Sequence, residues 1–142
     1  MAARLAVIEH PHCLVAATFY LTTPASAGVI EQTRSSSRGG MAHACELETS
    51  IYLHLDPEAV DMEKAVDERG YPETEHAWMD WSDGPLKLMP WWSSFSSSGV
   101  QGDATKATAD KGRVLFEAAV DELCAFVRGL SSVPLPDRKD RH

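Results

Sequence analysis

The chain has 142 residues, of which 44% are apolar and 24% are charged, a composition typical of a globular protein with one domain. Its 13 lysines and arginines against 21 aspartates and glutamates leave a formal net charge of −8, which repels the phosphates of nucleic acids. We therefore expect no nucleic-acid partner.

Two short apolar segments at the start of the chain predict β-strands. Residues 5–8 and 13–20 are rich in Val, Ile, Leu, Thr and aromatic residues. Their continuous apolar character favours burial on both faces, as in a parallel or mixed sheet with flanking helices. Residues 22–40 are rich in Thr, Ser, Arg and Gly, and they predict a loop around one short helical turn.

The first long helix is predicted over residues 43–55. Leu47, Ile51 and Leu55 recur every four positions, which places one apolar stripe along a helix. Pro57 ends this helix because the residue before a proline is pushed out of the helical region. The same proline suits the first turn of a short acidic helix, which residues 61–67 could extend by a further turn.

Residues 70–102 predict a long irregular stretch. They contain four tryptophans and a serine-rich run, and such a stretch is unusual in a compact domain unless it is functional or packs on another subunit. The tryptophans could form the wall of a binding pocket or be buried by a neighbouring subunit. We favour a subunit contact for Trp91 and Trp92, since they would otherwise leave an apolar patch exposed.

A second long helix is predicted after residue 108. Asp103, Thr105 and Thr108 are candidate helix caps. The apolar residues that follow fall on one helical face: Leu115, Ala118, Ala119, Leu123, Phe126 and Val127. Gly129 is placed to stop this helix, and residues 131–142 predict a disordered tail.

The cysteines and the hydropathy of the chain bear on its location. Cys13, Cys45 and Cys124 are an odd number of cysteines without paired spacing, which favours free thiols in a reducing compartment. The apolar run at residues 5–8 is too short for a signal peptide or a membrane span. We expect a cytoplasmic protein that has no membrane partner.

Three blocks of sequence resemble one family. Residues 39–50 read Gly-Gly-Met-Ala-His-Ala-Cys-Glu-Leu-Glu-Thr-Ser, similar to the His-Ala-Gly-Glu-x-Glu-Thr-Ser signature of the creatininase family, with Cys45 replacing the usual glycine. Residues 56–61 resemble the Pro-Glu-x-Val-Asp that follows in that family. Residues 99–113 resemble its Gly-Asp-x-Thr and Ala-Thr-Ala-x-Lys-Gly-Arg blocks. The resemblance covers nearly all of residues 5–130.

The resemblance implies an α/β fold with a largely parallel sheet, and a two-metal site of zinc or manganese that hydrolyses a cyclic or linear amide. The family's metal-ligand motifs, Glu-x-His, a bridging Asp and Gly-His-x-Glu, precede the part that this chain matches, so we assign no metal ligand here. Residues 1–130 are therefore expected to be the C-terminal portion of a creatininase-like domain.

His43 and Glu48 are the catalytic candidates that the resemblance carries over. His43 matches the histidine that lies beside the metals and moves a substrate proton, a task that suits an imidazole with an ordinary pKa of ~6.5. Glu46 and Glu48 are about 200° apart on a helix, so both cannot face one site, and we favour Glu48 as the residue that orients His43 or supports the metal shell. The alternative roles are a helix-capping histidine and a solvated acid near the helix N-terminus.

Other polar residues suit other roles. Thr49 and Ser50 fit helix packing or backbone hydrogen bonding better than nucleophilic catalysis. A rival metal site would use His10 and His12, which share a face if they lie on a strand, with Cys13 and, after folding, Cys45.

Two functions remain open from the sequence. The first is a creatininase-family metal-dependent amidohydrolase in a truncated or split form, acting on a small amide substrate. The second is a non-catalytic remnant that acts as an oligomerising or interaction protein. The expected protein partner is a second copy of the chain or a complementing N-terminal half.

Overall fold

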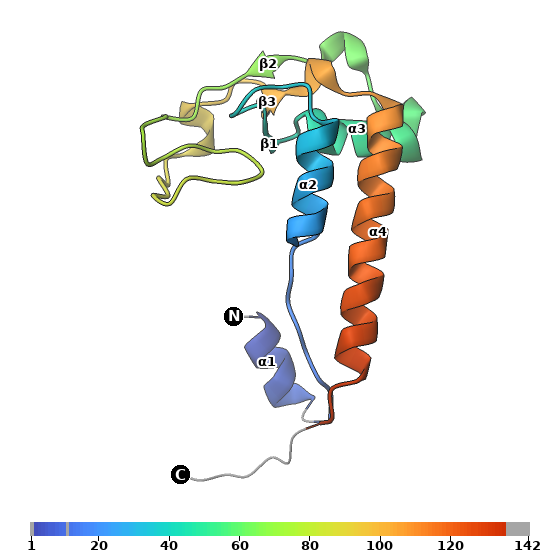
Figure 1. Cartoon of the computed structure of the whole chain (residues 1–142). Helices are drawn as coiled ribbons and strands as arrows, with labels where there is room; N and C mark the ends of the chain where they lie inside the picture. The colour runs from blue at the N-terminus through green and yellow to red at the C-terminus, as the bar shows by residue number, and fades with distance from the viewer. Residues whose placement is uncertain (1, 11, 136–142) are drawn as a thin grey trace.

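The computed structural model describes residues 2–10 and 12–135 of the chain. Its α-helices are α1 (Ala2–Glu9), α2 (Pro24–Thr33), α3 (Glu46–Leu55) and α4 (Ala109–Ser131). The strands are β1 (Met41–His43), β2 (Asp67–Glu68) and β3 (Gln101–Asp103), and the 3-10 turns are η1 (Pro57–Ala59), η2 (Met62–Lys64), η3 (Trp92–Ser94) and η4 (Ala104–Lys106). The small sheet lies at one end of the α2, α3 and α4 group, and α1 lies at the other end (Figure 1).

The sheet has the strand order β1-β3-β2, and both pairs of strands are antiparallel. The chain combines helices with a sheet, which confirms the expected α/β class. The sheet itself is antiparallel, whereas the sequence predicted a parallel or mixed one. Its central strand contains Gly102, with a φ of +134°. A Cβ there would lie 2.6 Å from the Gly40 carbonyl oxygen and 2.8 Å from the Cys45 Cβ, so only glycine fits.

The two strands predicted at the start of the chain are wrong. Residues 5–8 belong to α1. A short apolar run does not distinguish a strand from a helix, and the neighbouring alanines favour the helix. Residues 13–20 form an irregular connection from α1 to α2 (Figure 1), and within the described ranges no strand pairs with them. A strand without a hydrogen-bonded neighbour is not stable in water.

Helix α2 is longer than the single turn predicted for residues 22–40, because contacts from a distant helix support its start. The Thr23 Oγ1 accepts a hydrogen bond from the Ser26 N–H at 3.3 Å. The Glu122 carboxylate of α4 accepts hydrogen bonds from the Thr22 N–H at 3.1 Å, the Thr23 N–H at 2.7 Å and the Ser26 Oγ at 2.8 Å. A buried carboxylate thus binds backbone donors that α2 itself cannot satisfy.

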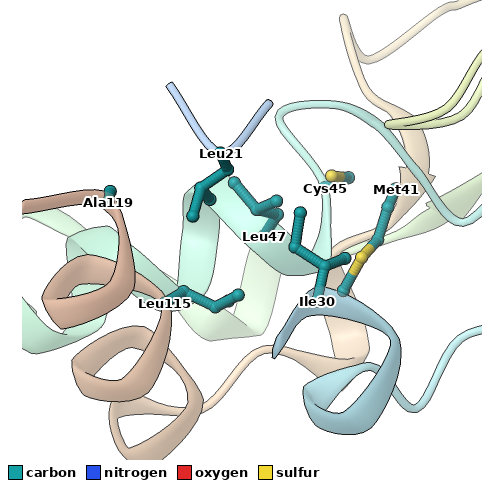
Figure 2. Close-up of a cluster of buried hydrophobic side chains, with 7 residues drawn as sticks. All are labelled: Leu21, Ile30, Met41, Cys45, Leu47, Leu115 and Ala119. Carbon is teal, nitrogen blue, oxygen red and sulfur yellow. The ribbon is translucent and has the colours of Figure 1, made fainter. Parts of the chain in front are cut away.

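The two long helices predicted from the sequence are confirmed as α3 and α4. Their apolar residues meet in a core formed with β1, α2 and Leu21 of the connection that precedes α2 (Figure 2). It contains Leu21, Ile30, Met41, Cys45, Leu47, Leu115 and Ala119. Leu55 and Val127, at the far ends of the predicted stripes, are exposed. The core therefore covers only the parts of both helices near the sheet.

The remaining segments largely follow their predicted pattern. Helix α3 ends before Asp56, η1 begins at Pro57, and residues 70–100 contain only the short turn η3. Thr108 caps α4, as predicted, but α4 continues through Gly129 to Ser131. Residues 136–142 of the predicted tail lie outside the described residues. Among the described helices, none is long and apolar enough to cross a bilayer.

Helices α3 and α4 approach most closely at Gly112. A Cβ on Gly112 would lie 1.8 Å from the Ser50 carbonyl oxygen. Next to this contact, the buried Ser50 Oγ accepts a hydrogen bond from the Thr108 N–H at 3.1 Å. Ser50 therefore serves helix packing, in agreement with the sequence prediction.

We predict that Gly112→Ala lowers the free energy of unfolding by about 1–3 kcal/mol, because the new methyl group forces α3 and α4 apart. Urea unfolding followed by circular dichroism measures this change. Gly129→Ala is the matched control, since nothing lies within 4 Å of its Cβ position in the same helix. That variant should gain stability, by roughly 0.5–1 kcal/mol, and equal effects of the two substitutions would contradict the close contact.

We also predict that acid removes the support that Glu122 gives to α2. Burial raises the pKa of Glu122, but hydrogen bonds led by that from the Thr23 N–H outweigh burial and hold the pKa at about 2, below its ordinary 4.5. The ionised carboxylate therefore stabilises the fold fully above pH 4.5, and this contribution is lost as the pH falls toward 2.

Glu122→Gln tests this prediction. It should cost about 1–3 kcal/mol at neutral pH and flatten the loss of stability between pH 4.5 and 2. Asp121→Asn, which removes the neighbouring exposed charge, should leave both the stability and its pH profile close to those of the unchanged chain. Parallel pH profiles of the unchanged chain and Glu122→Gln would contradict the assignment.

Candidate functional site

One cavity of the structure has a volume of about 550 Å³. Its wall comes from β1, the first turn of α3, α2 and the residues before it, the loop at residues 79–83 and the start of η3. The polar and aromatic side chains among its lining residues are Phe19, Tyr20, Thr22, His43, Glu48, Asp80, Trp81, Ser82, Asp83 and Trp92. Both catalytic candidates of the sequence analysis therefore line this one cavity.

His43 is the last residue of β1, and its side chain is exposed at the cavity. The turn into α3 follows at once, through Ala44 with a φ of +49°. The His43 imidazole packs against the Trp92 indole in a T-shaped arrangement, with 4.8 Å between ring centroids. This contact holds the imidazole at the cavity while leaving part of it open to solvent.

Glu48 joins the cavity to the start of α3. Its Oε2 accepts hydrogen bonds from the Cys45 N–H at 3.2 Å and from the Cys45 Sγ at 2.8 Å. The Cys45 side chain in turn accepts from the backbone of Glu48, which completes a capping box. The hydrogen bonds of the Glu48 carboxylate in the described structure go to Cys45, and none joins it to His43. Its proposed orienting role stays a prediction.

Glu46 points away from the cavity, as the helical geometry predicted. The side chain is fully buried, and its carboxylate accepts hydrogen bonds from the Ser35 N–H at 2.7 Å and the Ser36 N–H at 2.8 Å. The Lys111 Nζ donates a third at 2.5 Å. Burial raises the pKa of Glu46, but the Lys111 ammonium and the serine donors outweigh it and lower the pKa. Glu46 thus ties α3 to α4 and to the loop after α2.

Two weak acids near Glu48 stay protonated at neutral pH. Burial, assisted by the charge of Glu48, raises the pKa of the Cys45 thiol. Burial also raises the pKa of Tyr20, and the charge of Glu48 adds to the effect. A neutral phenol therefore stands beside the Glu48 carboxylate at this cavity. Tyr20 can donate a hydrogen bond to a carbonyl or carboxylate there.

Asp80 fixes the chain around the start of β1, and the sequence analysis made no prediction for this residue. This buried carboxylate accepts hydrogen bonds from the Gly39 N–H at 3.0 Å, the Met41 N–H at 3.1 Å and the Trp81 N–H at 3.0 Å. The Arg34 guanidinium forms an ion pair with it at 3.1 Å. The only signal in the sequence was a single aspartate between tryptophans in an irregular stretch, which gives no indication of burial.

The four tryptophans have different surroundings. Trp81 and Trp92 line the cavity, and the subunit contact favoured for Trp92 stays a prediction. Trp91 is 86% exposed, and its expected contact with another subunit stays a prediction. Trp78 packs instead under the Arg38 guanidinium, 4.9 Å from the ring centroid.

The described residues do not form a metal centre. Within residues 2–10 and 12–135, no group of three or more His, Cys, Asp and Glu side chains is placed to hold a metal ion. The rival site at His10, His12 and Cys13 is therefore wrong: these residues are exposed in a turn after α1, whereas Cys45 is buried in the core beside Glu48. Histidines two residues apart share a face on a strand, and no strand forms at these described residues.

We predict that Cys45 is protected from thiol reagents. Cys13 and Cys124 are exposed and should react with Ellman's reagent in the native protein, whereas Cys45 is buried and its thiolate is disfavoured. Cys45 should react only after urea unfolding. Cys45→Ala should abolish the late reaction without changing the early one, and a native protein in which all three thiols react at one rate would contradict this burial.

Comparison with known proteins gives one consistent result. The family model of creatinine amidohydrolases matches residues 1–127. A mycofactocin precursor peptide peptidase from Mycobacterium tuberculosis is 37% identical over 90 residues, which cover 59% of this chain and 31% of the relative.

Solved structures share the fold over about half of their length. A putative creatinine amidohydrolase from Bacteroides fragilis has a TM-score of 0.69 and 23% identity, covering 95% of this chain and 50% of that one. A manganese creatininase has a TM-score of 0.63 and 23% identity, covering 89% and 48%. Because the family model spans most of the chain, this protein belongs to the creatinine amidohydrolase family of hydrolases.

Proposed function

We propose that this chain supplies the substrate-binding and proton-transferring part of an amide-hydrolysing site. The observation that carries the proposal is the placement of His43 and Glu48, the two residues matched to the family signature, on one cavity of about 550 Å³. The proposed reaction is the addition of water to an amide carbonyl, followed by loss of the nitrogen. The leaving nitrogen needs a proton, and His43 is the residue proposed to give it.

The surroundings of His43 suit that role. Its imidazole is exposed at the cavity and packed on one side by Trp92 at 4.8 Å, so a substrate can reach it from the other side. Glu48 contributes a negative charge to the same cavity, and this charge attracts an N–H group of the substrate. Tyr20 is proposed to donate a hydrogen bond to the substrate carbonyl from the same wall.

The substrate is proposed to be a small cyclic amide or a peptide. Creatinine, in the name of the solved relatives, contains a cyclic amide, and the mycobacterial relative is named for a precursor peptide. Both compounds contain an amide carbon–nitrogen bond. The aromatic walls from Trp81 and Trp92 suit the flat face of either kind of amide.

The divalent metal that the family resemblance implies does not fit the described residues, since none of their carboxylate, thiol and imidazole groups cluster in threes. No step proposed for this chain passes through a metal ion. We propose that metal ligands come from a second polypeptide segment, either a complementing N-terminal half or a further copy. The cytoplasm remains the proposed location, in line with the free thiols of Cys13, Cys45 and Cys124.

A second candidate function is association without catalysis. Its supporting observation is the exposed apolar surface of α1 and α4, which includes Leu5, Ile8, Val120, Leu123 and Val127. Apolar surface of this kind marks protein–protein contacts. The complementing half of the first proposal would bind to the same surface. Only a measurement of hydrolytic activity therefore distinguishes the two functions.

Co-expression separates them. We expect the chain alone to lack creatinine hydrolysis, and co-expression with the N-terminal half of a related enzyme to restore metal-dependent turnover. His43→Ala in this chain should then lower kcat by about 10²–10⁴-fold, the usual contribution of a general acid or base. His76→Ala, which removes an exposed imidazole outside the cavity lining, is the matched control.

Each outcome decides between the candidates. Robust turnover by the chain alone would contradict the need for a second segment. Full activity of the co-expressed His43→Ala variant would remove His43 from the reaction. A co-purifying pair without turnover on creatinine or on peptide amides would favour the association function.

A further inference from the structure

Glu68 does not line the cavity, but it contacts a segment that is hydrogen-bonded to Trp92, a residue that does. The residue is in β2, opposite Gly102 of the central strand, and its side chain is partly buried. Its carboxylate contacts the segment Ser96–Ser98, called here the serine segment. The family signature does not include Glu68, and the proposed function gives it no task.

The Glu68 carboxylate is surrounded by donors of the serine segment. Oε1 accepts hydrogen bonds from the Ser97 N–H at 2.6 Å and the Ser97 Oγ at 2.8 Å. Oε2 accepts from the Ser98 N–H at 3.0 Å, from the Ser96 Oγ at 3.3 Å and from the Ser98 Oγ. The hydrogen bond from the Ser97 N–H, with those from Ser98 after it, lowers the pKa of Glu68 to about 2. The carboxylate is therefore ionised at neutral pH.

The serine segment in turn holds Trp92. The Ser96 N–H donates to the Trp92 carbonyl at 3.1 Å, and the Trp92 Nε1 donates to the Gly99 carbonyl at 3.3 Å. Both the backbone and the indole ring of Trp92 are therefore hydrogen-bonded to residues 96–99. The Trp92 ring then packs against His43 at a centroid distance of 4.8 Å.

A serine-rich segment has little apolar surface of its own with which to stay in place. Phe95, directly before the segment, is buried against Tyr71 at a centroid distance of 5.5 Å and also packs against Trp92 at 4.9 Å. Phe95 anchors the segment before Ser96, and Glu68 is the contact that anchors it after Ser96. A glutamine could not replace Glu68, because one of its two terminal groups is a donor that would face the serine N–H groups.

We propose that Glu68 is a positioning residue that fixes the serine segment and thereby seats Trp92 against the His43 imidazole. The inference rests on the proposed function for its effect on the reaction. Its geometric part concerns only this chain. It can therefore be tested without turnover.

The test is the nuclear magnetic resonance spectrum of the full chain with labelled histidine and tryptophan. The indole ring current of Trp92 displaces the His43 imidazole signals, which His43→Ala identifies by their absence. In Glu68→Gln we expect this displacement to be lost and the Trp92 Nε1–H to exchange faster with solvent. Glu58→Gln, which removes an exposed carboxylate in η1, is the matched control and should change neither signal.

A second variant approaches the contact from the other side. Ser97→Ala combined with Ser98→Ala removes two hydroxyl donors while keeping both backbone donors. We expect a smaller change in the same direction, and this variant replaces Glu68→Gln if the latter does not fold. Unchanged His43 signals in a folded Glu68→Gln, or in the double variant if Glu68→Gln does not fold, would overturn the proposal.

Turnover of the co-expressed pair separates this inference from the proposed function. In Glu68→Gln we expect kcat to fall because His43 is misplaced, and KM to rise because Trp92 is also part of the cavity wall. Loss of the ring-current displacement in Glu68→Gln with unchanged kcat would support the seating of Trp92 and contradict the proton-transfer role of His43. Unchanged signals with a lower kcat would contradict the seating alone.

Discussion

The close packing of α3 on α4 at Gly112 is the contact on which the rest of the site depends. The Ser50 carbonyl occupies the space that any side chain at residue 112 would need, so the two helices are nearly in backbone contact. This contact fixes the distance between α3 and α4. It thereby fixes the position of Glu48 and of the turn that carries His43. The Leu47 side chain of α3 and the Leu115 side chain of α4 both belong to the buried core (Figure 2).

Carboxylates hold the irregular parts of the chain in place. From the helix pair, Glu46 binds the loop after α2 and Glu122 binds the start of α2. From the loop at residues 79–83, Asp80 binds the chain before β1. Each of them accepts at least two backbone N–H groups that no regular secondary structure satisfies. Such hydrogen bonds to a charged group are stronger than neutral ones. A chain with a sheet of only three short strands therefore keeps its long loops ordered through acidic side chains.

Sequence reasoning succeeded where the signal was local. The spacing of Leu47, Ile51 and Leu55 predicted α3, and the angle between Glu46 and Glu48 correctly assigned them to different sides of that helix. The family signature led to the cavity through His43. Sequence reasoning failed at residues 5–8 and 13–20, because whether an apolar segment forms a strand depends on whether a neighbouring strand is available to pair with it. It also missed Asp80 and the contacts of Glu68, because their partners are far away in the sequence.

The contact between Cys45 and Gly102 links two positions that are far apart in the sequence. The Cβ of residue 45 already occupies the space in which a Cβ of residue 102 would lie, at only 2.8 Å. The family blocks that this chain resembles have a glycine at both positions, whereas this chain has Cys45 at the first and keeps Gly102 at the second. A side chain at residue 45 therefore requires glycine at residue 102, but residue 102 stays glycine in either case, because its φ is +134° and the Gly40 carbonyl oxygen lies 2.6 Å from its Cβ position. Either position taken alone would give an incomplete account of which residues this turn accepts.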